Sequence, residues 1–121
     1  MFNKKLLYTI IVLLALDFIY LSLVSNHFND LLVNIQGSKL QMKYIPALFA
    51  YIFIVFGVYY FIIRDNRSIF DAMLLGWVIY AIYEFTNMAI IKNWSWKTVA
   101  IDGIWGGILF GLTTYIVKLL S

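Results

Sequence analysis

Three carboxylates interrupt the long apolar stretches of this 121-residue chain, and their chemistry needs an explanation. Asp17, Glu84 and Asp102 each lie inside a stretch long enough to cross a bilayer. An ionisable group at that depth is energetically costly, so such a residue is a candidate for function by default. No lysine, arginine or histidine lies at comparable depth in the sequence, so the three acids have no protein cation to pair with.

Buried acids without a cationic partner can be stabilised in three ways. The carboxyl groups hold protons, they bind a cation or an amine, or water reaches them through a vestibule. The first two predict a proton path or a cation site, and the metal ligands would then be Asp17, Glu84 and Asp102. A structural interpretation competes with these, because a carboxyl near a helix end can simply bond neighbouring aromatic and amide groups. Asp102, near the start of its stretch, also gains from the helix dipole.

Topology predicts that the three acids converge. At about 1.5 Å per residue, Asp17 and Glu84 lie roughly 10 and 11 Å inside the C-terminal ends of their stretches, and Asp102 roughly 5 Å inside the start of its own. In an up-down-up-down arrangement these ends share one leaflet. Polar neighbours fall on the same helical faces as the acids. The predicted ligand-binding pocket is lined by Asp17, Tyr20, Tyr80, Tyr83, Glu84, Asn87, Asp102 and Trp105.

The elements that must position these residues are membrane spans. The chain is 64% hydrophobic and 12% charged, with a mean hydropathy of +0.89, which excludes an ordinary soluble domain and a disordered chain. A span needs about 20 mostly apolar residues. The sequence predicts one all-α integral membrane domain over 1–121, a compact up-down bundle of four transmembrane helices joined by short connectors. The predicted spans are 6–24, 45–63, 69–91 and 99–120.

The connectors carry further predictions. Ser68, followed three residues later by Asp71, predicts a capping box at the start of the third span. Apolar residues at helical spacing between 25 and 44 predict a short interfacial helix between spans one and two. Trp94 and Trp96 are typical of an interfacial aromatic belt. Both termini are expected on one side of the membrane, and five basic residues at that side against four opposite favour the cytoplasm.

A glycine row in the fourth span predicts close helix packing. Gly103, Gly107 and Gly111 are spaced four apart, which lets another helix approach. The partner is either another span of the same chain or a second protomer, so a homo-oligomer stays open.

Several classes of function lack their residues. There is no cysteine, and His27 is the only histidine, so thiolate and multi-histidine metal sites are excluded. No motif identifies a cofactor. The net charge of +3 is scattered without a basic run, which argues against nucleic acid as a partner.

Motifs in all four spans resemble a known family. The third and fourth spans carry a tyrosine–acid–asparagine string, a tryptophan and an Asp-x-x-Trp-Gly motif; the first carries Asp17-x-x-Tyr20, and the second Phe49-x-Tyr51 and Gly57. This pattern is similar to that of the membrane-protein family named domain of unknown function 2177, although Glu84 stands where the family has aspartate. The resemblance implies a four-span integral membrane protein and brings no activity with it.

Three functions remain open on these residues. The first is a membrane-embedded pocket that binds or translocates a cation, a proton or an amine-bearing molecule, with Trp105 and Tyr80 offering cation–π faces. The second is an intramembrane enzyme acting on a lipid or isoprenoid through paired carboxyls. The third is a structural or assembly protein, in which the acids hold helices together. Few polar residues lie in the leaflet opposite the acids, where Thr9, Thr113 and Thr114 are the evident ones, and this argues against a simple pore through the membrane.

Overall fold

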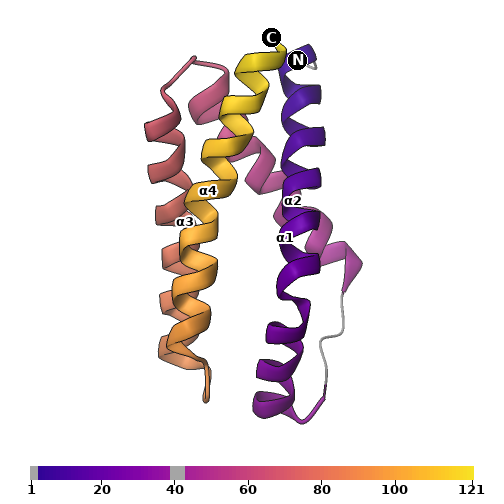
Figure 1. Ribbon diagram of the computed structural model, residues 1–121, viewed down its shortest axis with the longest axis vertical. Coiled ribbons are helices and arrows are strands. Elements are labelled where there is room, and N and C mark those ends of the chain that lie inside the picture. Colours follow the sequence, from indigo (N-terminus) through magenta and orange to yellow (C-terminus); the bar gives the residue numbers. More distant parts are fainter. Residues whose placement is uncertain (1–2, 39–42) are drawn as a thin grey trace.

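Four long helices make up the computed structural model, which describes residues 3–38 and 43–121 (Figure 1). Helix α1 spans Lys4–Gln36, α2 spans Tyr44–Val58, α3 spans Ile69–Ile90 and α4 spans Trp96–Leu120. A π-helical turn, η1 (Tyr59–Ile63), continues α2 directly. All four segments are long and apolar enough to cross a membrane. The predicted all-α membrane protein with four spans is confirmed.

Side-chain caps set the starts of three helices. Asn3 Oδ1 accepts from the Leu6 backbone N–H at 2.9 Å, and Ser68 Oγ from that of Asp71 at 3.0 Å. These bonds satisfy donors that the first turn of a helix leaves free. The predicted cap at Ser68 is confirmed, whereas the Asp71 carboxylate pairs with the Arg67 guanidinium at 2.9 Å. Ser95 caps α4 in the same way, so that helix begins at Trp96, before the expected residue 99.

The segment after the first span is helical, but it is not a separate interfacial helix. Helix α1 continues without a break to Gln36, because no glycine or proline interrupts the sequence before Gly37. Gly37 adopts the left-handed conformation at φ 78° and closes the helix. Helix α1 therefore rises about 50 Å at about 1.5 Å per residue. That exceeds a hydrocarbon core of about 30 Å, so its last turns extend past the core.

The helices pack unequally. Helices α3 and α4 lie side by side along their length, α1 packs on α4, and α2 crosses behind at an oblique angle (Figure 1). The start of α1 and the end of α4 share one end of the bundle, called the upper end after its place in Figure 1. The buried apolar core includes Leu13, Leu109 and Phe110.

The closest helix contact uses glycines on both partners. A Cβ placed on Gly76 would lie 2.1 Å from the Gly106 carbonyl oxygen, and one on Gly106 would lie 2.4 Å from the Tyr80 ring. Of the predicted packing row, Gly107 and Gly111 face Met73 of α3. A Cβ on Gly103 would meet nothing within 4 Å. The crossing of α3 and α4 therefore centres on Gly76 and Gly106.

Candidate functional site

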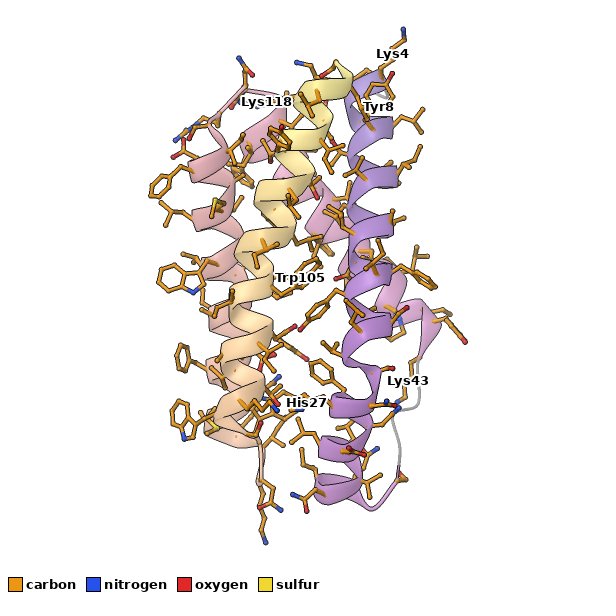
Figure 2. All side chains as sticks on the ribbon, viewed as in Figure 1. Lys4, Tyr8, His27, Lys43, Trp105 and Lys118 are labelled. Carbon is orange, nitrogen blue, oxygen red and sulfur yellow. The ribbon has the colours of Figure 1, made fainter. Side chains whose placement is uncertain are left out.

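Two hydrogen bonds join α1 to α4 at the level of the predicted pocket. The Tyr20 hydroxyl donates to Asp102 Oδ1 at 3.0 Å, and Trp105 Nε1–H donates to Asp17 Oδ1 at 3.0 Å. The acid and the aromatic donor are three positions apart on each helix, about one turn, so both pairs can form between the antiparallel helices. The Tyr20 and Trp105 rings stack with centroids 4.5 Å apart and planes 4° from parallel. Figure 2 shows Trp105 reaching toward α1 from α4.

Asp17 is fully satisfied by donors. Its second oxygen, Oδ2, accepts from the Tyr51 hydroxyl of α2. Tyr51 therefore forms a third wall of the site; it belongs to the second-span motif but not to the predicted pocket. With one donor on each oxygen and 6% of its surface exposed, Asp17 is held as an acceptor between three helices.

Glu84 is not satisfied in this way. Trp94 Nε1–H donates to Oε1 at 2.9 Å, so Trp94 lies in the site and not only in an aromatic belt. The other oxygen, Oε2, has no donor among the described residues, although Glu84 is 0% exposed. The Asp102 carboxyl lies near enough to the Glu84 carboxyl for the two groups to interact directly. Two acids thus face each other in the protein interior.

Among the residues that the structure describes, no basic side chain pairs with these acids. Within residues 3–38 and 43–121, the ion pairs are Arg64–Asp65 and Arg67–Asp71, both at the upper end. The same residues contain no group of three acidic, histidine or cysteine side chains placed to hold a metal ion. Asp17, Glu84 and Asp102 therefore do not form a joint ligand set in the structure. We call these three acids, with Tyr20, Tyr51, Trp94 and Trp105, the acid cluster.

Below the acid cluster, a polar chain leads to the lower end. His27 Nε2 and Thr98 Oγ1 are hydrogen-bonded at 2.7 Å, and Ser95 Oγ lies 2.7 Å from the same hydroxyl. Thr98 is one helical turn from Asp102. His27 and Ser95 also line a surface pocket of about 690 Å³. His27 lies beyond the predicted first span of 6–24 but still on α1, and it points toward α4 (Figure 2).

Above the acid cluster, an apolar layer closes the bundle. Leu13, Leu109 and Phe110 are all fully buried there. Beyond them lie Thr9, Thr113 and Thr114, also fully buried. Polar side chains thus lie between the cluster and the lower end, and an apolar layer lies between its three acids and the upper end.

The remaining predicted pocket residues lie around this cluster. Tyr80 packs against Gly106 and meets the Phe110 ring edge-on, with centroids 6.5 Å apart. Tyr83 is 56% exposed and does not turn inward. Asn87 lies half-buried near the end of α3. Its backbone carbonyl accepts from the Ile91 backbone N–H at 2.8 Å. The structure thus brings Asp17, Tyr20, Glu84, Asp102 and Trp105 together, with Tyr80 alongside.

A family profile described as a predicted membrane protein matches residues 2–119, nearly the whole chain. The chain belongs to the DUF2177 family. No curated protein and no solved structure matches it. In this DUF2177 protein, the residues that carried the sequence resemblance are largely those that make the contacts of the acid cluster, including Tyr51 from the second-span motif.

Proposed function

We propose that this small multi-pass membrane protein binds a proton or a small monovalent cation between the carboxyl groups of Glu84 and Asp102. The observation that carries the proposal is Glu84, whose Oε2 is buried with no donor among the described residues and whose carboxyl interacts with that of Asp102. Two neighbouring buried carboxylates repel each other and are poorly solvated. A shared proton or a bound cation removes both costs.

Hydrogen bonding and burial favour the Glu84–Asp102 pair over Asp17 as the binding site. Asp17 already accepts from Tyr51 and Trp105, so its role is to position Trp105 and the stacked Tyr20. Glu84 has no exposed surface, which favours a proton or a bare small ion over an amine-bearing solute.

Access to the pair is proposed from the lower end. Thr98 connects His27 and Ser95 at the surface to the turn that carries Asp102. The layer of Leu13, Leu109 and Phe110 blocks the other direction. Binding and release from one side therefore fit the geometry better than an open pore. The basic residues favour a cytoplasmic upper end, so the site would open away from the cytoplasm.

The enzyme hypothesis is less well supported at this pair. General acid–base catalysis needs a substrate atom within hydrogen-bonding reach of the carboxyl groups. Glu84 is enclosed by protein, and its exposed surface is nil. A purely structural role is the stronger competitor, because aromatic donors bond all three acids.

Glu84→Gln separates binding from a structural role. The glutamine oxygen keeps the Trp94 bond, and its amide donates to Asp102, so we expect a folded protein. Wild-type stability should fall as pH rises, with a limiting slope of about 1.4 kcal/mol per pH unit where the folded protein keeps the shared proton and the unfolded chain has lost it. The variant should give a flatter curve. Thermal unfolding in detergent across pH, with lithium, sodium or potassium present, measures this.

A cation site adds a second signature. The ion that binds should restore wild-type stability at high pH and leave Glu84→Gln unchanged. Asp71→Asn, which alters an acid outside the acid cluster, serves as the matched control and should behave as wild type. Superimposable curves for wild type and Glu84→Gln in every salt would leave Glu84 as a structural residue.

A further inference from the structure

A long groove runs between α1 and the α2–η1 helix and meets the acid cluster at Tyr51. Its volume is about 870 Å³. One face of α1 forms one wall, with Leu6, Ile10 and Leu14, and a face of α2–η1 forms the other. The α2–η1 side is open, since Ile52 and Phe56 are each about half exposed. The groove therefore faces the bilayer, and the natural source of an occupant is a membrane lipid.

The groove has the length and polarity of one leaflet. From Asn3 to Leu14 the chain rises about 16 Å at about 1.5 Å per residue. One leaflet of the hydrocarbon core is about 15 Å thick. Apart from Tyr51 at the inner end, the polar lining residues gather at the upper end, where Asn3 Nδ2–H donates to the Tyr59 hydroxyl at 2.8 Å and Arg64 lines the mouth. Such an arrangement fits an amphiphile with its polar group at the surface.

Positive charge marks the mouth of the groove. The Arg64 guanidinium lies 3.8 Å from the Tyr60 ring centroid, which fixes it over the groove wall. Its side chain remains 46% exposed, and its contact with Asp65 is a long one at 3.5 Å. Lys4 lies at the same end of the bundle (Figure 2). Guanidinium donors bind phosphate oxygens well, so the charge favours an anionic headgroup.

The helical geometry of this wall is unusual. The π-helical turn η1 carries Tyr59 and Tyr60, both of which line the mouth. Single π-turns inside helices are frequently found at functional positions. We propose that this groove binds one anionic membrane phospholipid, with an acyl chain along α1 and the phosphate at Arg64.

The lipid site goes beyond the proton or cation site and does not depend on it. The groove and the acid cluster share one residue, Tyr51. Its ring lines the inner end of the groove, and its hydroxyl donates to Asp17. A bound chain would cover this tyrosine. Lipid occupancy is therefore expected to protect the Tyr51–Asp17 bond.

Native mass spectrometry of the detergent-solubilised full chain tests this site. The probes are phosphatidylglycerol, phosphatidylcholine with the same acyl chains, and inorganic phosphate. Wild type should retain one phosphatidylglycerol and bind it at least tenfold more tightly than phosphatidylcholine. Arg64→Gln should lose about tenfold in phosphatidylglycerol affinity, as expected for one charge-assisted contact. Ile52→Trp, which fills the groove from an exposed position, should lose both lipids.

Two matched variants make the test specific. Arg67→Gln removes an arginine from the same end of the bundle, and Ile82→Trp adds a tryptophan on the exposed face of α3; both should bind as wild type. Circular dichroism checks that all four variants are folded. The proposal is overturned if wild type does not discriminate between the two lipids, if inorganic phosphate alone saturates Arg64, or if the control variants lose lipid as strongly as Arg64→Gln and Ile52→Trp. None of these outcomes bears on Glu84.

Discussion

Gly76→Ala and Gly106→Ala should each destabilise the protein by about 3 kcal/mol, at the upper end of the usual range for overpacking. The new Cβ at position 76 would lie 2.1 Å from a backbone carbonyl oxygen, and the one at 106 would lie 2.5 Å from the Gly76 carbonyl oxygen. Backbone cannot turn aside as a flexible side chain can. Helices α3 and α4 must therefore separate along the interface that supports Glu84 and Asp102.

Unfolding in a detergent series, followed by circular dichroism, measures this loss. Gly103→Ala is the control on the same helix, because its Cβ would meet nothing within 4 Å. That substitution should be neutral or stabilise by up to about 1 kcal/mol through helix propensity. Equal effects at positions 103 and 106 would contradict the close approach of α3 and α4.

Asp17→Leu is expected to cost about 3–5 kcal/mol, since it leaves two donors unpaired in the protein interior. The Trp105 Nε1–H and the Tyr51 hydroxyl both donate to this carboxyl. Asp17→Asn should cost far less, about 1–2 kcal/mol. Its amide oxygen still accepts from Trp105, and the tyrosine hydroxyl can rotate to accept from the amide. Unfolding monitored by tryptophan fluorescence measures both variants.

A double-mutant cycle identifies the cause. Tyr51→Phe in the Asp17→Leu background removes one of the two unpaired donors, so it should recover about 1–3 kcal/mol relative to Asp17→Leu alone. In the wild-type background the same substitution should be destabilising. If Tyr51→Phe costs the same in both backgrounds, the hydroxyl does not donate to Asp17 in solution.

The sequence was sufficient to predict the spans and the meeting of the acids. Hydropathy and span length identify four helices, and the up-down topology brings Asp17 and Asp102 to the same level. The shared faces of Asp17 with Tyr20 and of Asp102 with Trp105 place these four residues in one predicted pocket, although which side chains bond across the helices comes from the structure. Ser68 was recognised as a cap because that signal is local.

Other features depend on how helices cross, which spacing within one helix does not determine. Tyr51 reaches Asp17 because α2 crosses obliquely, and Trp94 reaches Glu84 because the turn between α3 and α4 folds back. The glycine row pointed to α4, but the crossing centres on Gly106 together with Gly76 of α3. The continuation of α1 to Gln36 was missed because amphipathic sequence between 25 and 36 also suits a separate helix.

The antiparallel match of α1 and α4 also determines where the chain can change in length. Tyr20 with Asp102 and Asp17 with Trp105 are held in one register, and Leu13 and Leu109 extend it. One residue inserted within either helix would rotate everything beyond it by about 100° and break that register. Insertions between Gly37 and Lys43 leave the register untouched. Natural length variation among relatives is therefore expected to concentrate in that connector and to spare the interiors of the two helices.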